Sequence, residues 1–513
     1  MPPHTADERV NAQLATLARA AQRPWADDGP ALPAPADDAA LPARGDVSGM
    51  PTTGAVAATP LQPAGADDPA LQELIAQALR DNHDIAQARS RLDIARMEHG
   101  LAQGRRWPTP GAAIQQRERA GGGDGLGGKR VSQTSASLTL AQPVDIGGEL
   151  SRRAQAAHAQ TVALAFTHAD VQRRVVAEVS SAYWRIAYLH HEAALREAAL
   201  DDALQLASLA ETRHRLGEAS GDDVAQAARQ VAARRRACAV VAAEQASARH
   251  ALNQLLGTVD PAVDPVVNPA ADPAADLAAD LAADPAADPA AVPLRNRPVL
   301  PEVEQLPAID AGLPAHLLSR RPDLRAQEWR LREATQLVDA THASFYPKMM
   351  LTGSLGTASD SLLNWLRHPI ATLVAELSFP VLEWRVRQWR IGAADAQAQL
   401  ALNEFARALH QAMREVEDGL SGRRRYLAER AAMQARLAAT AREADLAGAR
   451  YRLGETGIAP WLERRAARRD AEATLLRLRY ELAVNAVTLQ QALGGALTSR
   501  TNLRTNLRTN LAH

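Results

Sequence analysis

The pentapeptide HRLGE at residues 214–218 returns as YRLGE at residues 451–455, an offset of 237 positions (451 − 214 = 237). Further pairs repeat in the same order at offsets of 237 or 239: LNQLLG at 252–257 with LQQALG at 489–494, QPV at 142–144 with FPV at 379–381, and DIAQA at 84–88 with DLRAQ at 323–327. Several anchors in one order at nearly one spacing indicate a tandem duplication.

Each repeat has the same predicted plan. A helix (about 69–103, or 323–344) ends at an aromatic–Pro step and is followed by two strand regions. A very long helix then begins near Pro143 or Pro380, and a second helix returns from the RLGE turn to Gly257 or Gly494. Residues 149–216 contain neither proline nor glycine, and at ~1.5 Å per residue they could form a helix of roughly 100 Å. Such lengths are typical of extended coiled coils.

The strand regions alternate between apolar and polar residues. In 371–379, Leu373, Ala375 and Leu377 share one face, and 132–140 alternates in the same way. The strand expected near 111–117 is weakly marked. A period of two with one apolar and one polar face is what a membrane β-barrel strand needs, although an edge hairpin packed on helices would give the same pattern. We predict a mainly α fold with a membrane β-barrel, built from a long helical coiled-coil barrel and four strands per chain.

Composition excludes several classes of protein. The 58 Lys and Arg balance 59 Asp and Glu, for a net charge of −1, which argues against a globally basic nucleic-acid binder. The single cysteine, Cys238, excludes an intrachain disulfide and a multi-cysteine metal site. No run of ~18 apolar residues predicts a transmembrane helix, and a barrel of alternating strands is compatible with that absence.

Low-complexity segments surround the repeats. The expected organisation is a Pro/Ala/Asp-rich lead (1–67), the first repeat (68–257), a linker (258–310) with an Asp-x-Ala-Ala run at 268–293, the second repeat (311–495) and a tail (496–513). Residues 1–10 lack the basic and then apolar profile of a secretory signal. We therefore expect either a protein that is not exported or a start upstream of Met1.

No catalytic constellation is found in the sequence. Residues 123–129 (GDGLGGK) match two phosphate-binding patterns by letter, but they lack the flanking strand and helix, so a loop between two strands is expected. There is no H-E-x-x-H or G-x-S-x-G motif, and Cys238 lies in an apolar stripe as a small packing residue. We predict no enzymatic activity, no cofactor and no metal site.

The sequence resembles the outer-membrane efflux proteins, or TolC-like channels, and in particular their NodT-type branch. The resemblance covers about 68–495. Its carrying stretches are DPALQELI at 68–75, GLPAHLLSRRPDLR at 312–325, FYP at 345–347, EVED at 415–418 and ARYRLG at 449–454.

The resemblance implies a homotrimer in the outer membrane, with a twelve-stranded barrel in the lipid and a twelve-helix tunnel in the periplasm. It further implies a passive exit duct of a tripartite efflux system, with a periplasmic adaptor protein and an inner-membrane pump, RND-type, as partners. Outer-membrane lipid, and no nucleic acid, would complete the list of partners. The branch usually carries a lipid-modified cysteine after a signal peptide, and no cysteine precedes Cys238 here.

The resemblance also assigns roles to particular residues. The hairpin tips that dock the adaptor would be Leu216, Gly217, Leu453 and Gly454. The acidic constriction of the closed channel would contain Asp222, Asp223 and Glu463, whereas Pro460 stands where a further acid is expected. The alternative for Asp222 and Asp223 is a helix N-cap that complements the helix dipole, and both roles can hold together. The alternative for the whole protein is a soluble coiled-coil scaffold, or a decayed relative that is not exported.

Overall fold

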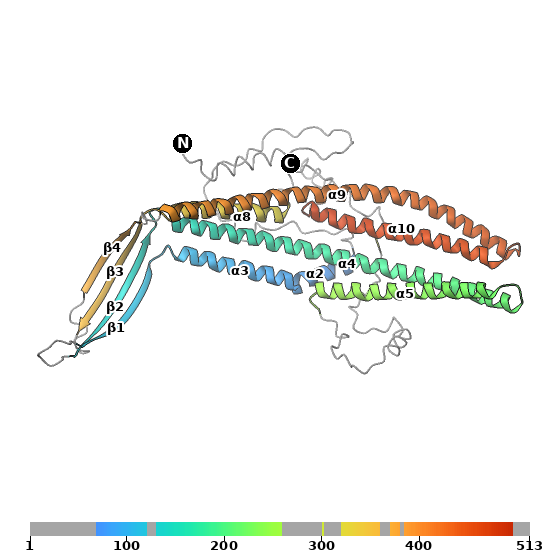
Figure 1. The fold of residues 1–513 in the computed structure, drawn as a ribbon, viewed down its shortest axis with the longest axis horizontal. Helices are drawn as coiled ribbons and strands as arrows, with labels where there is room; N and C mark the ends of the chain where they lie inside the picture. Colours follow the sequence, from blue (N-terminus) through green and yellow to red (C-terminus); the bar gives the residue numbers. More distant parts are fainter. Residues whose placement is uncertain are drawn as a thin grey trace, which may run out of the picture. The chain divides into compact units, whose positions relative to one another are not determined.

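The computed structural model describes residues 68–120, 130–258, 300–301, 320–359, 370–379 and 384–495. In chain order the elements are α2 (Pro69–Asp81), α3 (His83–Gly104), β1 (Thr109–Ala120), β2 (Arg130–Val144), α4 (Glu149–Arg215), α5 (Gly221–Leu255), α8 (Pro322–Ala343), β3 (Lys348–Ser359), β4 (Ile370–Ser378), α9 (Trp384–Arg452) and α10 (Ile458–Ala492) (Figure 1). The predicted order of helix, two strands, long helix and returning helix is therefore present twice.

The long helices of the two repeats match closely in length. Helix α4 has 67 residues and α9 has 69, and each is followed by a helix of 35 residues. Two glycines inside α9 lie where α10 side chains approach the α9 backbone closely. A Cβ added at Gly419 would lie 2.8 Å from Leu489 Cδ1, and one at Gly448 would lie 2.9 Å from Trp461 Nε1. We call these two contacts the glycine notches of the α9–α10 hairpin.

The prediction of a single helix over 69–103 is wrong at one point. Helix α2 ends at Asp81, and Asn82 adopts an extended conformation (ψ 129°) before α3 begins. The Asn82 side chain stabilises this break: its Oδ1 accepts hydrogen bonds from the backbone N–H groups of Asp84 (2.9 Å) and Ile85 (3.2 Å), and its Nδ2 donates to the Leu255 carbonyl oxygen (2.9 Å). A local cap and a contact with the end of α5 thus outweigh helical continuity.

The described residues divide into two compact units. The strand unit contains residues 88–168 and 322–410, and so holds all four strands. The hairpin unit contains 68–87, 169–258 and 411–495, together with the few described residues before α8, and so holds the α4–α5 and α9–α10 turns. Helices α3, α4 and α9 contribute residues to both units.

The core of the hairpin unit lies where the two repeats meet. The fully buried Tyr183 and Trp184 of α4 pack edge to face at 5.0 Å, and Tyr188 stacks on Tyr480 of α10 at 4.9 Å. Asp202 of α4 is buried and forms ion pairs with two α10 arginines, Arg465 at 3.2 Å and Arg469. Apolar packing and these ion pairs join the first repeat to the second.

The strand unit is held by one antiparallel sheet and by close helix packing. The sheet has the order β1-β2-β3-β4, and β1 pairs with β2 from Thr109↔Ala141 to Ala120↔Arg130. The weakly marked region 111–117 is therefore a strand, because pairing with β2 compensates for a poor alternation. Small buried residues of α4, Ala156, Ala159 and Ala163, allow neighbouring helices to approach closely.

Some predictions fall on residues that the structure does not describe. They are the lead, the Asp-rich run at 268–293, the tail, the glycine-rich loop at 121–129 and the turn at 380–383. Among the described helices, none has a stretch both long enough and apolar enough to cross a membrane.

Candidate functional site

The sheet presents one apolar face and one polar face. Directly paired residues lie on the same face of a sheet, and the row Leu138, Leu355, Ala371 is apolar whereas the neighbouring row Thr139, Ser354, Thr372 is polar. The apolar side chains are largely exposed within one chain, with 73 % of Leu373 accessible. The alternation predicted from sequence is confirmed. Strands β1 and β4 form the two edges, each with one paired neighbour among the described residues.

The α4–α5 turn reverses the chain through a glycine in the left-handed conformation. Gly217 has φ +78°, its N–H donates to the His214 carbonyl oxygen (3.0 Å), and the N–H of Glu218 donates to the Arg213 carbonyl oxygen (2.8 Å). These two bonds form a Schellman motif, which requires a positive φ that L side chains adopt only with strain. Leu216 beside it is 69 % exposed.

A hydrogen-bonded capping box begins the helix after this turn. The Asp223 N–H donates to Ser220 Oγ (3.2 Å), and the Ser220 N–H donates to Asp223 Oδ2 (2.9 Å). The N-cap residue is therefore Ser220, and Asp222 and Asp223 occupy the second and third helical positions. The N-cap expected at Asp222 or Asp223 lies instead at Ser220, because the serine hydroxyl accepts the hydrogen bond of the Asp223 N–H. The cap role of Asp223 within that box is confirmed.

The electrostatics of Asp223 follow from its partners. Hydrogen bonds from the Ser220 backbone N–H and hydroxyl, together with the charge of Arg213, lower the pKa of the Asp223 carboxyl below its ordinary 3.8. Asp222 and Asp223 are both exposed. The structure therefore places two exposed acidic side chains at the start of α5, where the helix dipole favours negative charge.

The α9–α10 turn reverses the chain in the same way but starts its helix differently. Gly454 has φ +76°, and the N–H groups of Gly454 and Glu455 bond the carbonyls of Tyr451 (3.0 Å) and Arg450 (2.9 Å). The N-cap residue is Gly457, which offers no side-chain cap. Pro460 lies in the first turn of α10, where a missing N–H costs nothing. Leu453 at the tip is 74 % exposed.

An aromatic stack across this turn was not predicted from the sequence. Tyr451, in the last turn of α9, stacks on Trp461 of α10 with ring centroids 5.4 Å apart and planes 14° apart. The Arg465 guanidinium lies over the Trp461 ring, 5.0 Å from its centroid. The ten-residue spacing gives no periodic signal, so only the presence of two aromatics flanking RLGE could have suggested the contact. Glu463 is exposed two residues further along α10.

The remaining candidate residues fall outside these turns. Cys238 is half-buried on α5, and burial raises the pKa of its thiol above 9.0, which fits a packing residue better than a nucleophile. The glycine-rich loop itself is not described, but the strands on either side of it pair with each other.

Two segments of the chain, residues 74–258 and 313–495, match the family described as "Outer membrane efflux protein". Among similar proteins, the pyoverdine export outer membrane protein OpmQ of Pseudomonas aeruginosa is 26% identical over 446 residues, which are 84% of this chain and 86% of OpmQ. The toluene efflux pump outer membrane protein TtgF of Pseudomonas putida is 27% identical over 368 residues, which are 69% of this chain and 68% of TtgF.

Solved structures of similar fold include two outer-membrane channels. The outer-membrane channel OprN matches with a TM-score of 0.70 and 23% identity, over 84% of this chain and 91% of OprN. The Campylobacter jejuni CmeC outer membrane channel matches with a TM-score of 0.72 and 17% identity, over 94% of this chain and 97% of CmeC. Likeness at such identities shows the fold.

Proposed function

The chain belongs to the outer membrane efflux protein family, and from that premise we propose that three copies form a passive exit duct, opened by a periplasmic adaptor and driven by an inner-membrane pump of the RND type. The outer-membrane location and the role in efflux follow from the family and from relatives named as outer-membrane parts of efflux pumps. This family is one of channels and not of enzymes.

The observation that carries the trimer is the open sheet. The described residues of one chain supply four strands, with edges at β1 and β4. Known bacterial barrels have at least ~8 strands, and an open edge is not tolerated in lipid because its backbone N–H and C=O groups would lack partners. Joining β4 of one copy to β1 of the next closes the sheet, and three copies give 3 × 4 = 12 strands.

The trimer is tested by deleting one strand. The full-length protein, extracted in detergent, should run as a trimer in size-exclusion chromatography with light scattering, and deletion of 132–140 should abolish the trimer while circular dichroism shows that the helices persist. The matched control shortens the 268–293 run, which should leave the trimer and export unchanged because loop closure depends weakly on length. A stable, water-soluble monomer of full helicity would instead support the scaffold alternative.

We further propose that the two hairpin tips dock the adaptor. Leu216 and Leu453 support this, because each is a large apolar side chain exposed beside a turn glycine. Exposed apolar residues at a defined position mark interaction sites more often than scattered ones do. Leu216→Glu with Leu453→Glu should abolish cross-linking to the adaptor. The control Leu446→Glu, at an exposed leucine within α9, should leave cross-linking intact, and equal losses would contradict the docking role.

The third part of the proposal places Asp222, Asp223 and Glu463 at the constriction of the closed channel. Three copies would bring three sets of carboxylates around one axis, where they attract cations and repel anions. Because Asp223 also completes the capping box, charge and cap must be separated. Asp223→Asn keeps an oxygen that can accept the Ser220 N–H and removes the charge. Ser220→Ala disrupts the cap and keeps the charge.

The measurement is ion selectivity of the closed channel in a planar bilayer. The variant Asp222→Asn, Asp223→Asn, Glu463→Gln should lose cation selectivity and block by multivalent cations, whereas Ser220→Ala should keep both. Unchanged selectivity in the triple variant would contradict the gate role and leave the channel itself untouched.

A further inference from the structure

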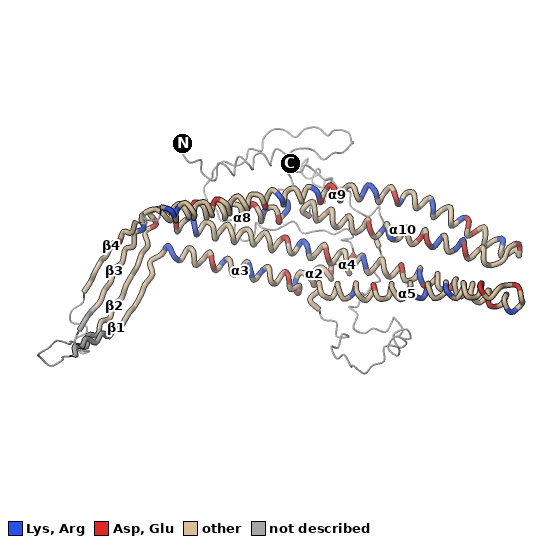
Figure 2. Tube along the Cα trace, in the orientation of Figure 1, with Lys and Arg blue, Asp and Glu red and all other residues tan. Residues whose placement is uncertain are grey.

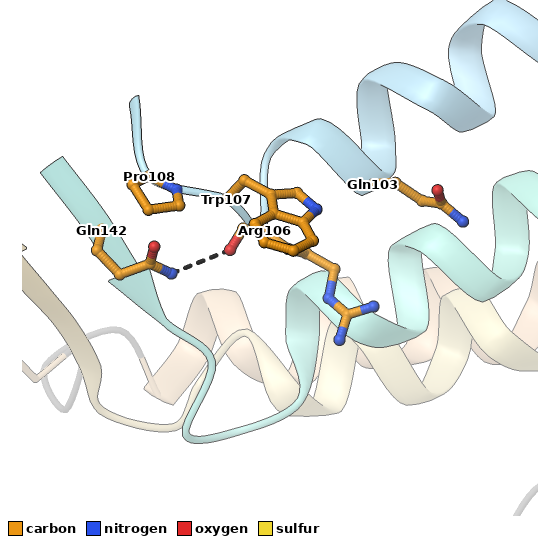
Figure 3. A pocket seen from close by; sticks show the side chains of 5 residues that line it. All are labelled: Gln103, Arg106, Trp107, Pro108 and Gln142. Carbon is orange, nitrogen blue, oxygen red and sulfur yellow. Dashed lines mark hydrogen bonds between the residues drawn. The ribbon is translucent and has the colours of Figure 1, made fainter. Parts of the chain in front are cut away.

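A cleft lies in the strand unit where α3 gives way to β1. It has a volume of about 560 Å³ and is lined by Gln103, Arg106, Trp107, Pro108 and Gln142 (Figure 3). The Arg106 guanidinium and the Gln103 amide lie on the helix side of the Trp107 indole, and Pro108 and Gln142 lie on its strand side. One cationic group, one aromatic ring and two amides therefore meet at a single junction.

Hydrogen bonds fix the backbone of this junction and the Gln142 side chain. Gln142 Nε2 donates to the carbonyl oxygens of Arg106 (3.0 Å) and Pro143 (2.8 Å), which ties the residues after α3 to the end of β2. The N–H groups of Arg106 and Trp107 close the last turn on Gln103 and Gly104 (both 3.0 Å). The Gln142 N–H groups are therefore used in backbone contacts, whereas the Arg106 side chain and the Trp107 ring can contact a ligand.

The Arg106 guanidinium lines the cleft and interacts with an acidic side chain that is not among the lining residues. Asp145 is the acidic group that interacts with Arg106: burial opposes ionisation of its carboxyl, but hydrogen bonds from Ser151 and Leu150 and the charge of Arg106 lower its pKa. The Asp145 oxygens already accept the N–H groups of Leu150 (3.1 Å) and Ser151 (2.8 Å). The carboxylate is thus engaged in starting α4, and the cleft keeps a cationic side chain.

The same level of the strand unit carries exposed aromatic and basic residues from both repeats. Trp107 is 71 % exposed, its counterpart Tyr346 in the second repeat 58 %, and Trp389 in the first turns of α9 82 %. Arg105 and Arg387 are exposed at this level too, and Figure 2 shows Lys and Arg, together with Asp and Glu, where the strands meet the helices. The apolar face of the sheet begins directly beyond this level.

This combination matches the chemistry of a membrane–water boundary. Trp and Tyr gather where hydrocarbon meets head groups. Arginine donates paired hydrogen bonds to phosphate oxygens and forms stronger contacts than neutral donors do. If the sheet lies in lipid, as the proposed function requires, the α3–β1 junction lies at the head-group layer on the helix side.

We propose that the cleft binds the phosphate of a glycerophospholipid in the leaflet facing the helices, with Arg106 donating to the phosphate oxygens and the Trp107 ring packing at the glycerol level. The proposal rests on the proposed function, because only a membrane-embedded sheet brings lipid to this junction. The chain would thereby select its depth in the bilayer at one defined lipid site in each copy.

The test counts bound lipid by native mass spectrometry. The full-length channel, delipidated in a sugar-based detergent, is titrated with phosphatidylethanolamine or phosphatidylglycerol, with diacylglycerol as the phosphate-free lipid, and with inorganic phosphate as competitor. We expect phospholipid to bind, diacylglycerol not to bind, and millimolar phosphate not to displace the lipid. Arg106→Gln should weaken phospholipid binding about tenfold, the loss expected for one charge-assisted hydrogen bond.

The matched control is Arg105→Gln, which removes the same charge one residue away and outside the cleft. It should leave lipid binding unchanged. Equal losses of lipid binding in both variants would show attraction by net charge alone. Displacement of the lipid by inorganic phosphate would show a site for free anions, and a trimer that binds no lipid would show an empty cleft. Each of these three results would overturn the inference. The same spectra report the oligomeric state, so a monomer would contradict the proposed function separately.

Discussion

The α4–α5 turn and the α9–α10 turn share the way in which they end a helix and differ in the way they start the next one. Both use a glycine at positive φ, Gly217 and Gly454, with the same two backbone hydrogen bonds. After that, the first turn uses hydrogen bonds between Ser220 and Asp223. The second uses the stacked rings of Tyr451 and Trp461.

The repeat offset aligns these devices position by position. Ser220 corresponds to Gly457 (457 − 220 = 237), Asp223 to Pro460 (460 − 223 = 237) and Val224 to Trp461 (461 − 224 = 237). The first turn therefore has the polar device, the Ser220–Asp223 hydrogen bonds, and the second has the aromatic device, the Tyr451–Trp461 stack. The reversal depends on backbone conformation, for which glycine has no good substitute. The start of the next helix can instead be stabilised by polar or by aromatic side chains.

The largest effect should come from breaking the aromatic device. Trp461→Ala removes the stack on Tyr451 and the contact with Arg465 and leaves a gap beside Gly448, so the opening free energy of the α9–α10 turn should fall by about 2–3 kcal/mol. The equivalent Val224→Ala should lower that of the α4–α5 turn by less than about 1 kcal/mol. Amide hydrogen exchange of the two turns measures both, and equal changes would contradict the difference between the turns.

The next effect should be the same in both turns. Gly217→Ala and Gly454→Ala have open space for a Cβ but place an L residue at φ +78° and +76°, at a cost of about 1–2 kcal/mol each. Hydrogen exchange of the last turns of α4 and α9 gives the two values. A large difference between them would show that one turn does not depend on the left-handed conformation.

A smaller, asymmetric effect should come from the polar device. Ser220→Ala removes the N-cap acceptor of α5 and should cost about 1 kcal/mol. The reverse exchange, Gly457→Ser, introduces at α10 the cap that it lacks and should gain a few tenths of a kcal/mol (roughly 0.3). The first turns of α5 and α10 report these changes in hydrogen exchange. A gain at Gly457→Ser as large as the loss at Ser220→Ala would contradict the expectation that glycine is itself a tolerable N-cap of α10.

The smallest effect is a pH dependence confined to one turn. Because the folded pKa of Asp223 lies below 3.8, its carboxylate contributes stability above the unfolded pKa, and this contribution is lost as pH falls through the folded pKa. Protection of the first turn of α5 should decline at acidic pH, and Asp223→Asn should abolish that decline. The α10 start has Pro460 at the equivalent position, so its protection should not show this step.

The sequence predicts long elements well and local contacts poorly. The absence of proline and glycine over 149–215 predicts α4, and the alternation in 132–140 and 371–379 predicts β2 and β4, because these signals extend over many residues. The break at Asn82 escapes the same reasoning, since a single asparagine fits a helical pattern. The break depends on the local cap of Asn82 and on its hydrogen bond to Leu255, 173 residues away, and the second contact has no signal in the local sequence.

The candidate site shows the same division. Ser220 and Asp223 have the spacing of a capping box, so this contact could be read from the chain. The Tyr451–Trp461 stack could not, because it depends on how closely α9 and α10 approach at Gly448. The cleft at Arg106 and Trp107 likewise needs Gln142, which pairing of β1 with β2 brings to the α3–β1 junction.

The glycine notches have a mechanical consequence. Leu489 enters at Gly419 and Trp461 enters at Gly448, and the two contacts are 29 residues apart on α9 (448 − 419 = 29) and 28 apart on α10 (489 − 461 = 28). The two side chains thus fit against the two glycines at nearly equal spacing along both helices. If one helix slides along the other, both glycine notches must lose their side chains together, whereas twisting of the pair as a unit leaves both contacts in place. These two contacts therefore oppose sliding of α10 along α9 and do not themselves oppose twisting of the pair as a unit.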